Sequence, residues 1–167
     1  MIANVLRNLN AFLDGRGYAG QVEELELPKL AVKTEEHRPG GYDAPVEIDQ
    51  GMEKLEAAAT LSGYDLDVLA SWGLAPGKSI PWTFKGALVS EDGTVNQAVV
   101  TLRGPVKGVE PGTWKPGEKS TLKVTMAPRY YKLAIGGTTV HEIDVENLKR
   151  IVNGEDQLQA IRNAIGL

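Results

Sequence analysis

The stretch from Gly73 to Ser79, GLAPGKS, has the residue types of a phosphate-binding loop. Three residues separate its glycines, whereas a phosphate-binding loop needs four so that successive backbone N–H groups surround the phosphates. The stretch also follows an expected helix and precedes an expected strand, which is the reverse of the order in such loops. We therefore interpret it as a turn that ends the helix.

The histidine and serine residues give little indication of a catalytic or metal-binding site. The chain has two histidines, His37 and His141, and no cysteine, and nothing in the spacing brings either histidine together with the other groups that a zinc site or a Ser-His-Asp site needs. Ser120 and Lys123 match a Ser-x-x-Lys pattern, but residues three apart in a strand point to opposite faces. We expect no catalytic residues, no metal ligands and no cofactor.

Carboxylates are abundant, and a pair of them could act as acid and base in a hydrolase. A sugar-cleaving cleft would need more aromatic residues than the 6% present, and Trp72 and Trp82 are expected in the core. No basic patch with interleaved aromatic residues suggests nucleic-acid binding. We therefore expect that the chain is not an enzyme.

The elements that must position these residues are mostly strands. Nineteen glycines and nine prolines separate many short β-type runs, which favours a β-rich fold. Asp92-Gly93 and Gly136-Gly137 predict hairpin turns. Alternation and β-type composition predict strands at Val22–Leu27, Ala31–Lys33, Ile80–Val89, Val95–Val109, Ser120–Ile135 and Thr138–Val145. The last four of these strands are expected to form one antiparallel meander.

Helical spacing of apolar residues predicts two short helices, Asp65–Trp72 and Glu155–Ile165. The stretch Gly51–Leu61 is ambiguous. Its composition favours a helix, yet its apolar residues from Leu55 to Leu61 also alternate as in a strand. From the residues alone we prefer a helix there.

The segment from Leu27 to Gly51 contains two β-capable runs, Lys29–Thr34 and Ala44–Gln50, on either side of a polar tip at Glu35–Asp43. Hairpins are commonly closed by loops of about 2–5 residues. A longer polar projection more often contacts something outside its own subunit. This arm therefore indicates a role in assembly more than a role in catalysis.

Length and composition fit one soluble domain over residues 1–167, with the arm projecting at about 34–51. Residues 21–65 carry a net charge of −7 and the remainder +3, a polarity that suits head-to-tail self-association but also fits a plain solvated acidic face. The absence of cysteine fits a reducing compartment. No apolar run resembles a signal peptide or approaches the roughly 20 residues of a membrane anchor.

Several stretches resemble the major tail tube proteins of contractile phages, and most closely the tube subunits of R-type pyocins, which are headless tail-like bacteriocins. The more specific ones are Leu27-Pro28-Lys29-Leu30, the tip Arg38–Gly41 and the run Gly154–Gln157 before the last helix. Longer stretches also match, and their order extends the resemblance over nearly the whole chain: NLNAFLDGRGYAGQVEELELPKLAVKTEEHRPGGYDAPVEIDQGMEKLEA, VVTLRGPVKGVEPGTWKPGEKSTLKVTM, RYYKL, HEID and RIVNGEDQLQAIRNAIGL.

The resemblance implies a mainly β fold: an antiparallel β-sandwich or partial barrel with one or two short helices. Six copies would complete an intersubunit β-barrel in a hexameric ring, and rings would stack into a rigid hollow tube that a contracting sheath drives through the target cell envelope. In such a protein Gly51–Leu61 resembles a strand, so we override the helix propensity there.

The resemblance also implies partners and a location. The partners are further copies of the chain, the sheath protein, baseplate and tail terminator proteins, and a tape measure protein in the lumen during assembly. DNA would pass without specific binding if the particle is a phage. The location is a virion or tail-like particle that is assembled in the bacterial cytoplasm and released by lysis.

We predict that the arm tip makes the ring-stacking contacts, helped by the N-terminal residues and the C-terminal helix. The stacking residues would be Glu35, Glu36, His37, Arg38, Pro39, Gly40, Gly41, Tyr42 and Asp43. Acidic residues that could line the lumen, where they would repel DNA phosphates, are Glu47, Asp49 and Glu53, with Glu35 at the edge.

Two other classes of function remain open from the residues. One is a monomeric β-sandwich module that binds a sugar or peptide, and the other is a hydrolase with acidic catalytic residues. The sequence also leaves open whether the tube belongs to a genome-delivering phage or to a headless particle, which strands face the lumen, which residues touch the sheath, and which host is the target.

Overall fold

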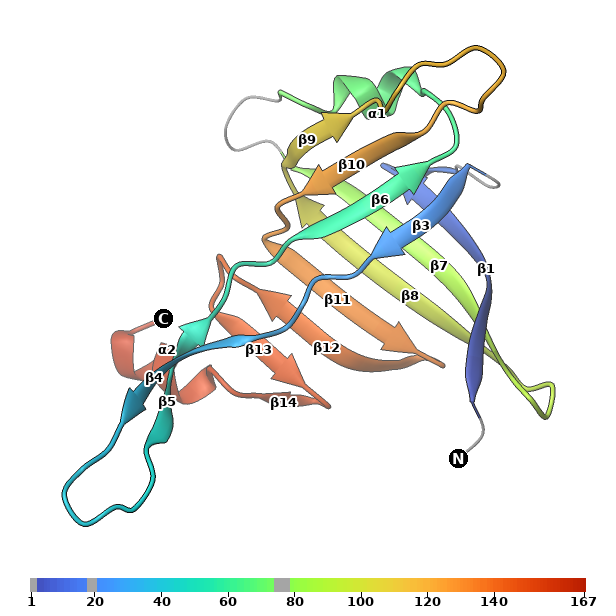
Figure 1. Cartoon of the computed structure of the whole chain (residues 1–167). Coiled ribbons are helices and arrows are strands. Elements are labelled where there is room, and N and C mark those ends of the chain that lie inside the picture. The colour runs from blue at the N-terminus through green and yellow to red at the C-terminus, as the bar shows by residue number, and fades with distance from the viewer. Residues whose placement is uncertain (1–2, 18–20, 74–78) are drawn as a thin grey trace.

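The computed structural model describes residues 3–17, 21–73 and 79–167. Two antiparallel sheets pack face to face, and a separate two-stranded arm extends from them (Figure 1). The larger sheet has the order β14 (Glu155–Asp156), β13 (Lys149–Val152), β12 (Thr138–Asp144), β11 (Tyr130–Ile135), β8 (Val95–Gly104), β7 (Ile80–Ser90), β1 (Asn4–Leu13) and β2 (Arg16–Gly17).

The smaller sheet has the order β3 (Val22–Glu26), β6 (Ala57–Leu61), β10 (Leu122–Met126) and β9 (Val106–Glu110), and the arm pairs β4 (Val32–His37) with β5 (Val46–Met52). The prediction of a mainly β, antiparallel fold with short helices is therefore confirmed. The predicted strand within Gly51–Leu61 is present as β6, so the preference for a helix from composition is wrong.

The core lies between the two sheets and explains why β6 is a strand. Ala57, Ala59 and Leu61 are each 1% exposed, and β6 pairs with β3 on one side and β10 on the other. Across from them Trp82 and Phe84 of β7 stack with ring centroids 5.8 Å apart. Small alanines leave room for these large rings, so tertiary packing outweighs the helix propensity of the segment.

Two predicted strands are each divided at a corner where the chain changes sheets. The run Val95–Val109 passes from β8 to β9 at Gly104-Pro105, and Ser120–Ile135 passes from β10 to β11 near Pro128. A Cβ on Gly104 would lie 2.5 Å from the Ala127 carbonyl oxygen, so only glycine fits where the two corners touch. The predicted single meander is therefore wrong, although the hairpins β7–β8 and β11–β12 are present.

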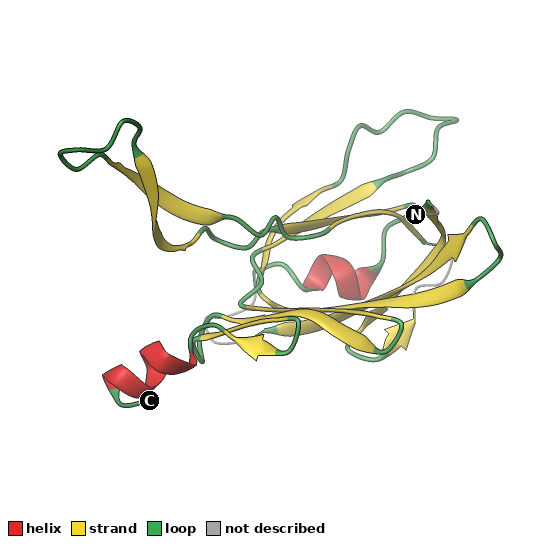
Figure 2. Cartoon of the chain, turned by 90° about the horizontal axis from the view of Figure 1, so that it is seen from below, coloured by secondary structure: helices red, strands yellow, loops and turns green. Residues whose placement is uncertain are grey.

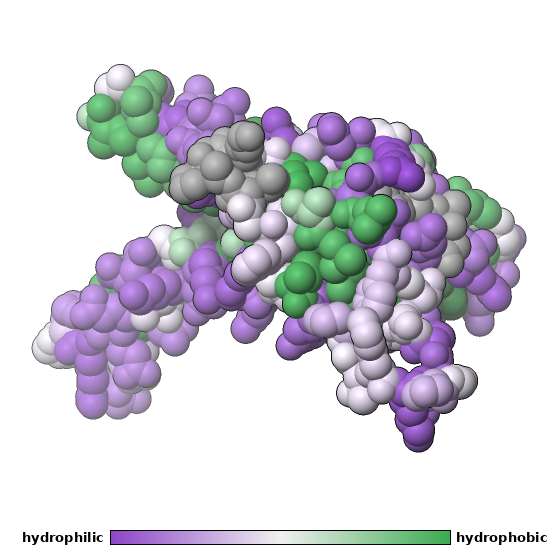
Figure 3. Space-filling model, turned by 90° about the horizontal axis from the view of Figure 1, so that it is seen from above, coloured by the Kyte–Doolittle hydropathy of each residue, from purple (hydrophilic) through white to green (hydrophobic). Residues whose placement is uncertain are grey.

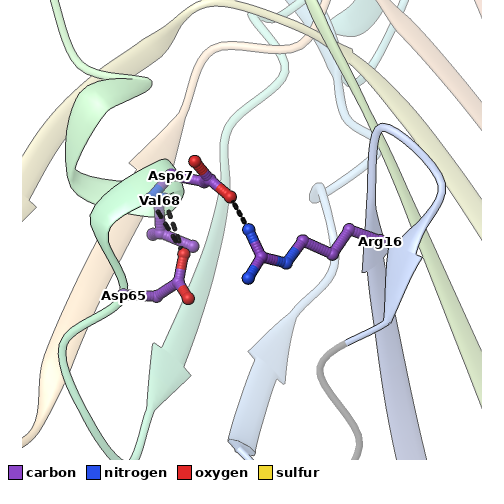
Figure 4. Close-up of polar contacts among 4 residues, drawn as sticks. All are labelled: Arg16, Asp65, Asp67 and Val68. Carbon is purple, nitrogen blue, oxygen red and sulfur yellow. Dashed lines mark hydrogen bonds and ion pairs between the residues drawn. The ribbon is translucent and has the colours of Figure 1, made fainter.

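Helix α1 (Leu66–Ala70) closes one end of the sandwich (Figures 1 and 2). Asp65 caps it by accepting hydrogen bonds from the backbone N–H groups of Asp67 and Val68, at 2.9 and 3.2 Å, and Val68 is fully buried. Arg16 of β2 forms an ion pair with Asp67 (Figure 4). The helix is thereby attached to the β1–β2 hairpin across the end of the sandwich.

Helix α1 ends at Ala70, earlier than predicted. Trp72, just beyond the helix, is 57% exposed, so the prediction that Trp72 lies in the core is wrong. Its indole N–H instead donates to the Lys107 carbonyl at 3.3 Å. Most of the turn-like stretch GLAPGKS, residues 74–78, lies outside the described residues. The C-terminal helix α2 spans Gln159–Ile165, because Glu155 and Asp156 belong to strand β14.

Candidate assembly surfaces

The arm is a twisted hairpin that projects away from both sheets (Figures 1 and 2). All six residues of β4 and the first six of β5 are exposed. The side chains of the arm therefore lie largely on the surface of the described chain. Exposed Val46 and Ile48, each more than 40% accessible, add apolar surface to an otherwise charged element.

The register of the arm sorts its side chains onto two faces, since directly paired residues of an antiparallel ladder share a face. Glu36 pairs with Glu47 and Thr34 pairs with Asp49, so one face carries three carboxylates. The opposite face carries Glu35 opposite Ile48 and His37 opposite Val46. The predicted stacking and lumen residues are thus interleaved on one hairpin rather than separated into two regions.

The tip of the arm is closed by a turn between Pro39 and Tyr42, whose backbone N–H donates to the Pro39 carbonyl at 3.2 Å. Gly41 has a φ of +91°, a conformation that favours glycine. The Arg38 Nε donates to the Tyr42 carbonyl at 3.1 Å. The tip is therefore held as a defined loop, with the Tyr42 side chain 53% exposed.

The base of the arm is tied to the larger sheet. Asp49 forms an ion pair with Arg150 of β13 at 3.8 Å, and the Asp49 carboxylate also accepts from the Gly51 backbone N–H at 2.7 Å. The backbone N–H of Glu53 donates to the Ala31 carbonyl at 2.9 Å, which closes the hairpin. These contacts fix the direction in which the arm projects.

The proposed lumen residues do not form one cluster. Glu47 lies on the outer part of the arm, Asp49 lies near its base beside Arg150, and Glu53 follows β5 next to Lys54. Sequence reasoning missed the Asp49–Arg150 contact, because the two residues are far apart in the sequence and no local pattern relates them.

The described residues contain no group of three or more His, Asp or Glu side chains placed to hold a metal ion. Ser120 precedes β10, Lys123 lies within it, and His141 lies in β12 of the other sheet. Within the same described ranges, no helix has the length and apolar character to cross a membrane.

Comparison with known proteins gives the decisive observation. A family model described as phage tail tube protein FII matches residues 3–166. The chain belongs to this family. It is 32% identical over 166 residues to the tail tube protein of Escherichia phage P2. This matched region covers 97% of this chain and 96% of that protein. It is 28% identical over 148 residues to the major tail tube protein of Serratia phage KSP20, covering 87% and 85% of the two.

A solved structure supports the fold. The chain matches a component of the extended sheath–tube complex of an extracellular contractile injection system, PVC, with a TM-score of 0.56 at 10% identity over 76% of this chain and 88% of that one. The protein is therefore a tail tube protein and a component of a phage tail or tail-like particle, and the resemblance to phage tail tube proteins noted from its sequence is confirmed. The family is one of structural tube proteins.

Proposed function

We propose that this tube protein forms hexameric rings and that the arm joins each ring to the next. The observation that carries this proposal is that the arm is an ordered hairpin exposed along nearly its whole length. Exposed segments that project from a rigid scaffold often carry binding residues, so an exposed arm of this kind is suited to contact another molecule. The contacts would come from Glu35–Asp43, with the apolar side chains of Val46 and Ile48 beside them.

Ring closure gives a physical reason for the unpaired sheet edges of the isolated subunit. Strands β1 and β3 lie at adjacent edges of the two sheets, and β1 pairs with β2 only through Phe12 and Leu13. Free strand edges are an aggregation hazard that closure into a barrel removes. A ring in which such edges meet neighbouring copies would satisfy these backbone groups.

Deletion of Arg38–Tyr42 tests the role of the arm. The shortened subunit should fold with an unchanged circular dichroism spectrum and form rings or small oligomers but no tubes in negative-stain electron microscopy. A matched control is Glu91→Ala in the equally exposed turn of the β7–β8 hairpin, which should polymerise normally. Tubes of ordinary length from the deletion variant would refute the proposal.

The acidic face of the arm, which carries Glu47 and Asp49, contributes in this proposal to a lumen wall that repels DNA phosphates, together with Glu53 just beyond β5. The density of carboxylates on one face supports it. Replacing Glu47 and Glu53 by lysine should make assembled tubes retain short DNA at low salt, whereas unmodified tubes should release it. Equal retention of DNA by the variant and unmodified tubes would contradict the assignment of Glu47 and Glu53 to the lumen wall.

The remaining partners follow from the family. The sheath protein would contact the outer tube surface, and the baseplate and tail terminator proteins would contact the tube ends. A tape measure protein would occupy the lumen during assembly, which would take place in the bacterial cytoplasm before release by lysis. A monomeric ligand-binding module is the alternative, and a stable monomer under assembly conditions in gel filtration would favour it.

A further inference from the structure

Helix α2 presents an apolar face that the described residues of its own chain leave largely exposed. Ile161 and Ile165 are one helical turn apart and are 54% and 60% exposed, and α2 has no buried residue. Ala160 and Ala164 widen the same stripe and are also exposed. Figure 3 shows this helix as a hydrophobic end of the molecule, beside the hydrophilic arm. A helix of this length is marginal in water by itself.

Polar contacts hold α2 in this exposed position. The Arg162 guanidinium donates to the Leu148 carbonyl at 2.7 Å and to the Asp156 carboxylate at 2.5 Å. Asp156 also accepts from the Leu158 backbone N–H at 3.1 Å, and Gly166 ends the helix in the left-handed conformation. The helix therefore projects in a fixed orientation rather than as a frayed tail.

An apolar groove of about 910 Å³ opens elsewhere on the same chain, between β3 and the inner face of the larger sheet. The smaller sheet is shorter than the larger one, so it leaves the far ends of β7, β8 and β11 uncovered (Figure 1). The apolar lining of the groove includes Leu9, Leu25, Leu88, Ala98, Leu133 and Ile135.

The helix and the groove lie on opposite sides of the subunit. Helix α2 follows β14 at one edge of the larger sheet, whereas β1 and β3, which wall the groove, lie at the other side (Figure 1). A contact between two different surfaces of identical copies is heterologous, and it closes into a ring when the rotation per copy allows it.

Charge is compatible with the same pairing. The groove wall formed by β3 carries Glu23, Glu24 and Glu26. Residues 157–167, which include α2, contain Arg162 and no Asp or Glu side chain. A helix without acidic side chains can approach this acidic wall without like-charge repulsion.

We propose that α2 of one copy docks in the groove of a second copy of this chain, with Ile161 and Ile165 against the inner face of the larger sheet. This inference rests on the proposed ring. It identifies an apolar contact between neighbours within a ring, in addition to the arm contact between rings.

Cross-linking can test the docking because the chain has no cysteine. The double variant Ile165→Cys, Leu88→Cys should give a ladder of covalent oligomers when the assembled protein is treated with a short bismaleimide reagent. The control Ile165→Cys, Val95→Cys should give none. Val95 is 64% exposed and pairs with Val89, so it lies on the opposite face of the sheet from Leu88.

Imaging the same samples separates this inference from the proposed function. Tubes without a ladder would overturn the docking and leave the tube function intact. A ladder without tubes would support the docking and count against stacking by the arm. Reaction of both thiols within one monomer would show that α2 folds onto its own groove, and the absence of both ladder and tubes would overturn both proposals.

A second variant does not depend on cross-linking. Ile161→Asp should fold normally, because Ile161 is 54% exposed, but it should lower ring formation at least tenfold in gel filtration. The matched control Asn163→Asp adds the same charge to the same helix at another exposed position. If both variants form rings equally well, the groove has another occupant, such as a partner protein or a small apolar ligand.

Discussion

Arg162 and Asp156 determine how α2 is held. The Arg162 guanidinium lowers the pKa of Asp156 below its usual range, mainly through the hydrogen bond between them, and the same bond raises the pKa of Arg162. A carboxyl group whose pKa is lowered by folding contributes stability above its ordinary pKa of about 3.9, and that contribution is lost as the pH falls through the folded value.

The expected result is that α2 loosens when the dispersed subunit is taken from about pH 5 to a pH well below the ordinary carboxyl pKa of about 3.9. The NMR chemical shifts of residues 159–165 would report it. Asp156→Asn should leave α2 loosened at both pH values, and the control Asp43→Asn in the arm tip should behave as the unmodified chain. A pH-independent helix in the unmodified chain would contradict the role of this ion pair.

Gly104 shows how a single backbone position fixes the change of sheets. A Cβ there would meet the Ala127 carbonyl oxygen at 2.5 Å and the Pro128 Cα at 2.7 Å. Both are backbone atoms, which cannot rotate out of the way as the end of a side chain could. Any side chain at this position must therefore separate the two corners.

Gly104→Ala should lower the free energy of unfolding by about 1–3 kcal/mol through overpacking. Gly108→Ala is the matched control, because it lies in the next strand with no atom within 4 Å of a new Cβ. That control should be neutral or stabilising by up to about 1 kcal/mol. Urea denaturation would measure both, and equal stability of the two variants would contradict the steric argument.

At the scale of elements, the arm contains a local conflict. Glu36 lies directly opposite Glu47 on the acidic face, and like charges in such a pair are destabilising. An unfavourable pair in a solvent-exposed hairpin suggests that the face is adapted to its surroundings in the assembled tube rather than to the stability of the free subunit.

Glu36→Lys should therefore strengthen the arm of the free subunit by about 0.2–1 kcal/mol. Amide hydrogen exchange in β4 and β5 should slow by about 1.4- to 5-fold. The control Glu35→Lys faces Ile48 rather than a carboxylate and should leave exchange unchanged. Faster exchange in Glu36→Lys would show that the two glutamates do not repel each other in the hairpin.

The sequence predicts some elements better than others for physical reasons. Hairpins such as β7–β8 are local, and their turn residues and alternation predict them. Strand β1 was not predicted, because its exposed outer half lacks a clean alternation. The change of sheets at Gly104 and the contact of Asp49 with Arg150 depend on residues distant in sequence, which no local pattern reveals. The arm was predictable because a long polar insertion between two strands is itself local.

At the scale of the whole molecule, the chain divides into a packed sandwich and two projections. The sandwich contains the fully buried side chains, including Trp82, Phe84 and Leu102. The arm strand β4 and helix α2 contain no buried residue. Local opening of such weakly packed elements costs far less free energy than global unfolding. Their order in the tube should therefore depend on neighbouring copies.

Hydrogen exchange on free subunits and on assembled tubes should separate these two parts. Amides of β7, β8 and β10 should exchange slowly in both states, whereas those of β4, β5 and α2 should exchange fast in the free subunit. Assembly should slow the second group at least about tenfold, which corresponds to about 1.4 kcal/mol of added stability. The exposed β7–β8 turn at Glu91–Gly93 is an internal reference that should change less.

The pattern of protection would also assign each projection to its contact. Protection of the arm in tubes but not in isolated rings would agree with a contact between rings, and protection of α2 already in rings would agree with docking between neighbours within one ring. If α2 remained unprotected in bare tubes, its apolar face would be free there, and the groove would have to be filled by something other than this helix.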